Sequence, residues 1–218
     1  TRRLWRCASV RICADGGANR LWDEVPRFEG AEACREELIP DVIKGDMDSI
    51  RPEVRRFYSE HGTQVMDESA DQDSTDLQKC LHYALALSPS PKRILVAGAL
   101  GGRLDHDLQN LSTLYMFPDS HIVLVGQHSL AFLLPSGRST VVPTPDAEGP
   151  TCGLVPCTGR AVASTRGLKW ELDETAMEFG ALVSTSNAIV AEEVEVETDL
   201  PLVWTTELAP DVGRGTAE

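Results

Sequence analysis

The chain has 218 residues, 42% of them hydrophobic and 25% charged, which suits a globular protein of one large or two small domains. Its net charge of −14, from 34 acidic and 20 basic residues, argues against DNA or RNA as a partner, because phosphate backbones need a basic surface. No apolar run approaches the roughly 18 residues that span a bilayer, so we expect no membrane partner. A polyphosphate ligand would need an accompanying divalent cation, whereas a cationic ligand would be attracted.

Cysteine usage indicates the compartment. No two cysteines form a Cys-x-x-Cys pair, so a zinc site is not expected. The scattered thiols indicate a reducing environment, and we expect a cytoplasmic protein. The sequence contains Cys7, Cys13, Cys34, Cys80, Cys152 and Cys157.

The first predicted unit is a short strand at 11–14 that ends in the turn Asp15-Gly-Gly-Ala-Asn19. Gly16 and Gly17 would let backbone N–H groups approach a ligand closely, and the helix that follows would offer its N-terminus to an anion. An ordinary strand-to-helix turn has the same composition. This turn alone is therefore weak support for a site.

The most informative stretch is 41–50, a short buried strand followed by a glycine turn and two acids. Asp46 and Asp48 stand one residue apart, and side chains at i and i+2 of an extended chain point the same way. Two adjacent carboxylates are costly unless a cation lies between them, and Mg²⁺ prefers such oxygen ligands. The alternative is a polar turn in which Asp48 or Ser49 caps the next helix.

A third strand at 64–66 precedes the most acidic segment, 67–76, which carries five carboxylates in ten residues. An apolar stripe at 3.6-residue spacing from Leu77 to Leu85 marks the helix that follows. Helix N-termini favour negative charge, which accounts for one or two of these acids. It does not account for five without a cation.

A fourth strand at 93–97 is uniformly apolar, as a central parallel strand would be, and a glycine-rich turn with Asp105 follows it. An apolar helix face from 104 to 115 and a fifth strand at 121–126 come next. The order of strand, acidic glycine turn and helix predicts a parallel sheet with all four acidic turns at the carboxyl ends of its strands. That edge is where open α/β sheets bind ligands.

After about residue 126 the sequence changes to short candidate strands separated by proline and glycine, and the segment 193–197 alternates strictly between Glu and Val. We therefore predict two domains. An α/β domain with a mostly parallel sheet would cover 1–135, and an all-β sandwich would cover 136–218.

Five motifs, in this order, resemble those of the eukaryotic-type thiamine pyrophosphokinase family. The resemblance runs from about residue 5 to residue 206. Members of this family usually have a further apolar strand before the first motif, so we expect the chain to be trimmed at its start. The motifs are Asp15-Gly-Gly-Ala-Asn19, Gly45-Asp-Met-Asp-Ser49, Asp71-Gln-Asp-Ser-Thr-Asp76, Gly101-Gly-Arg-Leu-Asp-His106 and Gly167-Leu-Lys-Trp170.

The resemblance implies a transferase that moves the pyrophosphoryl group of ATP to the hydroxyl of thiamine and releases AMP. It also implies that the α/β domain binds ATP and Mg²⁺, that the β-sandwich binds thiamine, and that a homodimer shares its active sites between subunits. Two alternatives stay open. A metal-dependent phosphohydrolase would use the same carboxylates with a water nucleophile, and a non-catalytic nucleotide or thiamine sensor would be expected to lack one or more of them.

The candidate site residues fall into three groups. The expected Mg²⁺ ligands, some of them through water, are Asp46, Asp48, Asp73, Asp76 and Asp105. The acids expected to be catalytic are Asp46, Asp48, Asp76 and Asp105. The predicted nucleotide contacts in the glycine turn are Asp15, Gly16 and Gly17. The resemblance adds Gln72, Thr75 and Arg103, and the guanidinium of the arginine would donate to a phosphate oxygen.

The third group would bind thiamine. Trp170 is predicted to stack on the cationic thiazolium ring, with a cation–π attraction of about 0.5 to 2 kcal/mol. Its polar sequence neighbours favour an exposed turn over the alternative, a place in the β-domain core. Ser186 and Asn187 are candidates for hydrogen bonds to the pyrimidine, although they could equally form an ordinary turn.

Overall fold

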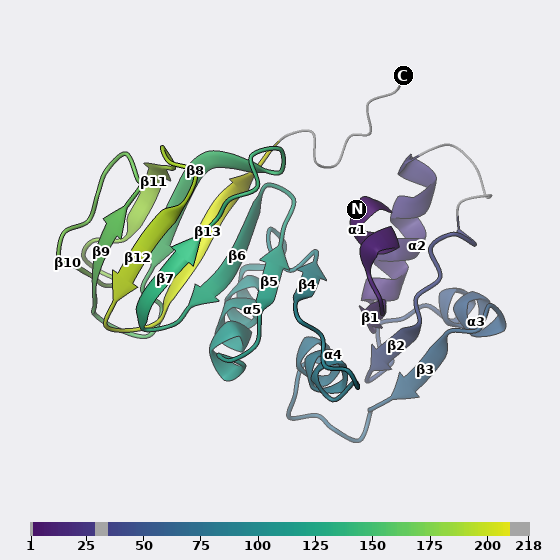
Figure 1. Ribbon diagram of the computed structural model, residues 1–218. Helices are drawn as coiled ribbons and strands as arrows, with labels where there is room; N and C mark the ends of the chain where they lie inside the picture. Colours follow the sequence, from purple (N-terminus) through teal and green to yellow (C-terminus); the bar gives the residue numbers. More distant parts are fainter. Residues whose placement is uncertain (1, 29–34, 210–218) are drawn as a thin grey trace. The chain divides into compact units, whose positions relative to one another are not determined.

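The computed structural model describes residues 2–28 and 35–209, which Figure 1 draws as coloured ribbon. The chain forms two compact units that divide between Pro91 and Lys92. Among the described residues, no helix combines the length and the apolar character that crossing a membrane requires.

The first unit contains a three-stranded sheet in the order β1-β2-β3, with both strand pairs parallel. The strands predicted at 11–14, after residue 41 and at 64–66 are confirmed, as is the helix with the stripe from Leu77 to Leu85. The elements of this unit are α1 (Arg2–Cys7), β1 (Ile12–Ala14), α2 (Gly17–Phe28), β2 (Val42–Gly45), α3 (Pro52–Glu60), β3 (Gln64–Asp67) and α4 (Asp76–Leu85).

The central strand β2 anchors this unit, since all four of its residues are buried. Ile43 of β2 packs with Cys13 of β1, and with Val54 and Tyr58 of α3, in one apolar cluster. Parallel strands end at the same edge of a sheet. The turns after β1, β2 and β3 therefore start from one side of a rigid, buried support.

The second unit has two sheets (Figure 1). The six-stranded sheet runs β11-β8-β13-β6-β5-β4, and the four-stranded sheet runs β10-β9-β12-β7. Its elements are β4 (Ile94–Ala97), α5 (Leu104–Met116), β5 (Ile122–Val125), β6 (Ser129–Leu134), β7 (Gly137–Val141), β8 (Glu148–Val155), β9 (Ala161–Arg166), β10 (Thr175–Met177), β11 (Ser184–Ala188), β12 (Val194–Thr198) and β13 (Leu202–Leu208).

Side chains from both sheets of the second unit pack into one buried cluster. Trp204 and Leu154 enter it from the six-stranded sheet, and Val194, Val196 and Met177 enter it from the four-stranded sheet. The strict alternation predicted for 193–197 is confirmed in β12, where both valines are fully buried. The β-rich part therefore has a core to which both of its sheets contribute.

The division of the chain differs from the predicted boundary after residue 135. β4 pairs in parallel with β5, and β5 continues into an antiparallel ladder with β6, where Leu124 lies opposite Ala131. Because the hydrogen bonding is continuous from β4 to β6, these strands belong to the sheet of the second unit. The expectation that one parallel sheet carries all four acidic turns was therefore wrong. The first three follow β1, β2 and β3, and the fourth follows β4.

Candidate functional site

Asp15 stands directly after β1 and is almost fully buried, with 1% of its surface exposed. Its Oδ2 accepts the N–H of Ser49 at 2.9 Å and its Oδ1 accepts the N–H of Ile50 at 3.1 Å. Burial raises the pKa of Asp15, and the charge of Asp76 adds to this, while the backbone N–H bonds act in the opposite direction. The carboxylate of Asp15 thus fixes the turn that follows β2.

Gly45 ends β2 where two acidic side chains approach the backbone. A Cβ at this position would lie 2.7 Å from the Cβ of Asp15 and 2.8 Å from Oδ1 of Asp76. Only glycine leaves room for both acids. After this close approach, the N–H of Asp46 donates to Oδ1 of Asp76 at 3.0 Å, and the N–H of Asp48 donates to Oδ1 of Asp46 at 3.2 Å.

Three acids from the first two turns form a group that fits a cation. Asp15, Asp46 and Asp48 each offer one carboxylate oxygen, and these oxygens lie within 4.8 Å of one another. The donor set is chemically suited to Mg²⁺, which binds hard oxygen ligands and keeps part of its water shell. Asp48 is exposed and Asp46 is half-buried, so the group is open to a ligand from solvent.

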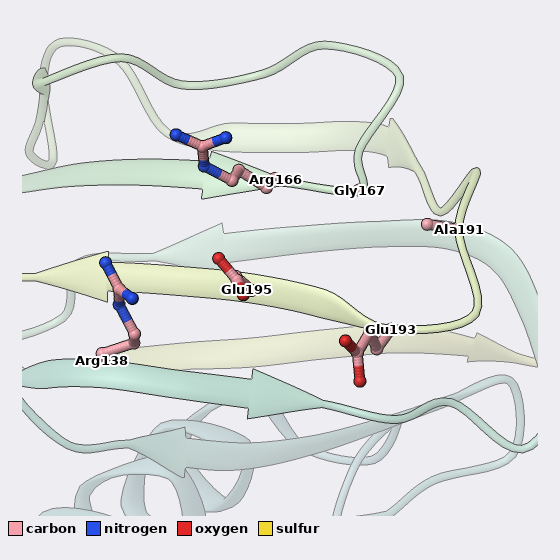
Figure 2. Close-up of a pocket in the computed structure, with 6 residues that line it drawn as sticks. All are labelled: Arg138, Arg166, Gly167, Ala191, Glu193 and Glu195. Carbon is pink, nitrogen blue, oxygen red and sulfur yellow. The ribbon is translucent and has the colours of Figure 1, made fainter.

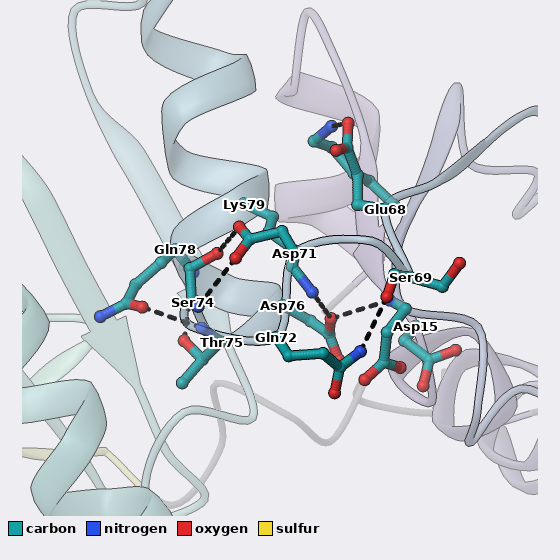
Figure 3. A network of polar contacts seen from close by, with 12 residues as sticks. Asp15, Glu68, Ser69, Asp71, Gln72, Ser74, Thr75, Asp76, Gln78 and Lys79 are labelled. Carbon is teal, nitrogen blue, oxygen red and sulfur yellow. Dashed lines mark hydrogen bonds and ion pairs between the residues drawn. The ribbon is translucent and has the colours of Figure 1, made fainter.

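The third acidic turn leads into α4 through a reciprocal cap (Figure 3). The hydroxyl of Thr75 accepts the N–H of Gln78 at 3.3 Å, and Oε1 of Gln78 accepts the N–H of Thr75 at 2.8 Å. This cap places Asp76 at the first helical position, where its carboxylate reaches the end of β2. Gln72 and Asp73 are exposed in the same turn, and Nε2 of Gln72 donates to the carbonyl of Ser69 at 2.9 Å.

Two buried lysines near these acids were missed by the sequence reasoning. Lys44 on β2 and Lys79 on α4 are 7% and 5% exposed. The ammonium of Lys44 forms an ion pair with Glu68, and that of Lys79 lies 3.4 Å from Oδ1 of Asp76. The sequence does contain a signal for both, since one lysine lies inside an apolar strand and the other beside the apolar stripe of a helix. A lysine at such a position is expected to be buried, and a buried charge needs a partner.

Arg103 and Asp105 stand at the start of α5 in the second unit. The guanidinium of Arg103 donates from Nε to Oδ1 of Asp105 at 3.1 Å and from Nη2 to Oδ2 at 2.5 Å. This bidentate bond holds the pKa of the Asp105 carboxyl below its usual range. The neighbouring Asp107, which the sequence reasoning did not single out, accepts the N–H groups of Gly101 at 2.9 Å and Gly102 at 3.4 Å.

Trp170 lies between β9 and β10 with 55% of its surface exposed, so the predicted exposed turn is confirmed. The buried Asn187 fixes the backbone of this turn, because its Oδ1 accepts the N–H of Trp170 at 3.1 Å and its Nδ2 donates to the carbonyl of Trp170 at 2.7 Å. The ammonium of Lys169 lies 4.6 Å from the centroid of the indole. One face of the ring therefore already attracts a cation.

Ser186 and Asn187 lie at an irregularity of β11, where the register to β8 shifts between Ser184 and Asn187. Ser186 is exposed and adopts a positive φ of 57°. Both polar atoms of the Asn187 amide are engaged with the backbone of Trp170. In the free protein this amide therefore acts on the position of Trp170.

A separate hollow of about 430 Å³ opens over β7, β9 and β12 in the second unit (Figure 2). Two arginines and two glutamates are among the residues that line it. Arg138 forms an ion pair at 3.1 Å with Glu197. None of the predicted site residues lines this hollow. Its lining consists of Arg138, Arg166, Gly167, Ala191, Glu193 and Glu195.

Comparison with known proteins gives consistent matches along the chain. The family model described as thiamin pyrophosphokinase, catalytic domain, matches residues 1–125, and the one described as thiamin pyrophosphokinase, vitamin B1 binding domain, matches residues 138–203. Thiamine pyrophosphokinase 1 of Arabidopsis thaliana is 50% identical over 94% of this chain and 80% of its own length.

More distant relatives match over similar shares. Thiamin pyrophosphokinase 1 of Caenorhabditis elegans is 31% identical over 94% of this chain and 82% of its own length. The solved structure of thiamin pyrophosphokinase from Candida albicans is 26% identical, with a TM-score of 0.81 over 94% of this chain and 83% of that chain.

Proposed function

This chain belongs to the thiamin pyrophosphokinase family, and we propose that the acids at the carboxyl ends of β1, β2 and β3 hold Mg²⁺ and ATP for its reaction. The enzyme transfers the pyrophosphoryl group of ATP to thiamine. The thiamine hydroxyl oxygen bonds to the β-phosphorus, and the bond from that phosphorus to the oxygen bridging it to the α-phosphate breaks. The bridging oxygen leaves with AMP, and the hydroxyl proton passes to a carboxylate of the site or to water.

The observation that carries the proposed site is the convergence of Asp15, Asp46 and Asp48 within 4.8 Å. Asp46 and Asp48 would offer their oxygens to the cation, while Asp15 holds their turn in place through Ser49 and Ile50. Bound Mg²⁺ would supply charge neutralisation for the phosphates, which is what pyrophosphoryl transfer mainly requires. Asp76 orients Asp46 through its backbone N–H.

The remaining predicted contacts complete the proposal for ATP. Gly16 directly precedes α2 and Gly17 begins it, at a helix N-terminus of the kind that favours an anion. Gln72 and Thr75 would contact the nucleotide, and Asp73 and Asp105 would act on the metal through water. Arg103 would contact a phosphate oxygen by exchanging its exposed partner Asp105 for it.

A product analysis tests the proposed function. With thiamine, ATP and Mg²⁺, separation by HPLC should give thiamine diphosphate and AMP in equal amounts. Formation of ADP or free phosphate without thiamine diphosphate would support a phosphohydrolase instead. Binding of both ligands without turnover would support a sensor.

For thiamine, we propose that Trp170 stacks on the thiazolium ring, that Ser186 bonds the pyrimidine, and that Asn187, whose amide is engaged with the backbone of Trp170, holds the indole in place beside it. The exposed indole, fixed at its backbone by Asn187 and already close to a cation, supports this role. Trp170→Ala should weaken thiamine binding by roughly tenfold or more and barely alter ATP binding, because the cation–π contact is lost. Calorimetric titration of each ligand measures both, and equal losses for the two ligands would assign Trp170 a folding role.

We also propose a cytoplasmic homodimer in which the acids of one subunit act with the partner subunit's Trp170. Asp48→Asn would inactivate the sites, and Trp170→Ala would leave little activity when thiamine is kept well below its Kd, but a mixed dimer would contain one site with both changes and one with neither. Mixing equal amounts should restore about a quarter of wild-type activity, since half the dimers are mixed and each has one intact site of two. No recovery after subunit exchange, followed by mass spectrometry, would mean that each site is built within one chain.

A further inference from the structure

A small hollow of about 250 Å³ in the first unit brings buried positive charge next to the acidic turns. Lys44 and Lys79 line it together with Glu68, Asp71 and Ser74. Both ammonium groups are withdrawn from solvent, because the side chain of Lys44 is 8% exposed and that of Lys79 is 4% exposed. A charge held at such a position is retained only with partners, since its desolvation is costly.

The two lysines have different partners. The ammonium of Lys44 is bound to Glu68 and lies 5.8 Å from the ring centroid of Tyr83. Lys79 contacts Oδ1 of Asp76 at 3.4 Å, and its charge also contributes to the lowered pKa of Asp71, after the larger effects of hydrogen bonds from Ser74 and Asp73. Lys79 is therefore the buried lysine that contacts Asp76, at the end of the acidic segment.

Asp76 connects Lys79 to the candidate cation group. The same Oδ1 atom that meets Lys79 also accepts the N–H of Asp46 at 3.0 Å. Asp76 also lies near the buried Asp15, because a Cβ at Gly45 would lie 2.8 Å from Oδ1 of Asp76 and 2.7 Å from Cβ of Asp15. Like charges at this distance repel each other, so the arrangement needs a cation inside the protein before any metal arrives from solvent.

We propose that Lys79 is a positioning residue for pyrophosphoryl transfer: its ammonium holds the carboxylate of Asp76 against the backbone of Asp46, so that the acidic turns are assembled before the metal and the nucleotide bind. Lys79 itself touches neither substrate. The inference rests on the proposed function of these acids.

Two substitutions separate charge from packing. Lys79→Met keeps most of the side-chain length and removes the charge, whereas Lys79→Arg keeps the charge and changes the shape. Lys92→Met, at an exposed lysine outside the site, is the control. Lys79→Met should lower kcat by about tenfold or more and change the KM for thiamine by less than about twofold, because positioning is lost without loss of thiamine contacts. Lys79→Arg should retain at least about three times the kcat of Lys79→Met.

A second measurement does not depend on activity. Without Lys79 the acids repel each other most when no metal is present, so the melting temperature of Lys79→Met should fall by about 4 °C or more in EDTA. With saturating Mg²⁺ the fall in melting temperature should be less than about half as large, because the bound cation replaces the missing charge. If Lys79→Met does not fold, Lys79→Gln takes its place with the same expectations.

Failure of the role proposed for Lys79 can be told apart from failure of the proposed function, because the turnover of thiamine by the wild-type protein is measured in the same experiment. The proposal would be overturned if Lys79→Met had the kcat and the melting temperature of the wild-type protein. It would also be overturned if the melting temperature fell equally in EDTA and Mg²⁺ and Lys79→Arg had no more activity than Lys79→Met, since that pattern indicates packing alone.

Discussion

Exchanging Asp48 for asparagine should lower kcat at least about a hundredfold and leave the fold intact, because a neutral amide cannot replace a carboxylate beside Mg²⁺ and polyphosphate. Asp48 is exposed, and its Oδ1 accepts the hydroxyl of the adjacent Ser49 at 2.6 Å, so little packing depends on its charge. We expect a similar loss for Asp76→Asn. Steady-state kinetics across a Mg²⁺ titration, with circular dichroism of each variant, measures both effects.

Asp119→Asn is the matched control, since Asp119 is an exposed acid outside the candidate site. It should retain wild-type kcat and Mg²⁺ dependence. Full activity of Asp48→Asn, or wild-type activity that survives excess EDTA, would contradict a metal-dependent role for these acids.

Gly45→Ala should remove most activity through crowding alone. The new methyl would meet Cβ of Asp15 at 2.7 Å and Oδ1 of Asp76 at 2.8 Å, distances at which the side chains or the backbone must move. A displacement of about 1 Å of groups that position a reaction can cost on the order of a hundredfold in rate, and overpacking at such a site costs about 1–3 kcal/mol of stability. Kinetics and denaturant unfolding measure the two losses separately.

Gly149→Ala provides the comparison, because a Cβ there would meet only the side chain of Glu207, at 3.4 Å. It should leave both activity and the free energy of unfolding near wild type. If Gly45→Ala behaved like Gly149→Ala, the close approach of Asp15 and Asp76 to β2 would not be required for function.

Local sequence patterns predicted the elements of the first unit well. The apolar run before Gly45 became the buried strand β2, and the spacing of Asp46 and Asp48 placed both acids in one turn. The presence of Asp15 in the same group was not predicted. It depends on the pairing of β1 with β2, which brings together turns 30 residues apart and leaves no periodic signal in either segment.

Pairing between distant strands also explains why the structure of the second unit differs from the prediction. The apolar segment that forms β4 has the character of a parallel strand, but its pattern does not reveal that β5 joins it to β6. The contact between Trp170 and Asn187, 17 residues apart, likewise depends on how β11 is placed, and the sequence showed only two polar residues after a strand. The roles of Lys44 and Lys79 depend on their burial next to acidic side chains, and the composition of the sequence does not show which lysines are buried.

This chain should move a pyrophosphoryl group as one unit over its acidic turns. The most direct measurement follows ATP that carries ³²P at the β-phosphorus, incubated with thiamine and Mg²⁺. We expect the label to appear in thiamine diphosphate, AMP to be unlabelled, and Asp48→Asn to abolish the transfer. Label that remains in ADP, or is released as phosphate or pyrophosphate without entering a thiamine product, would contradict it.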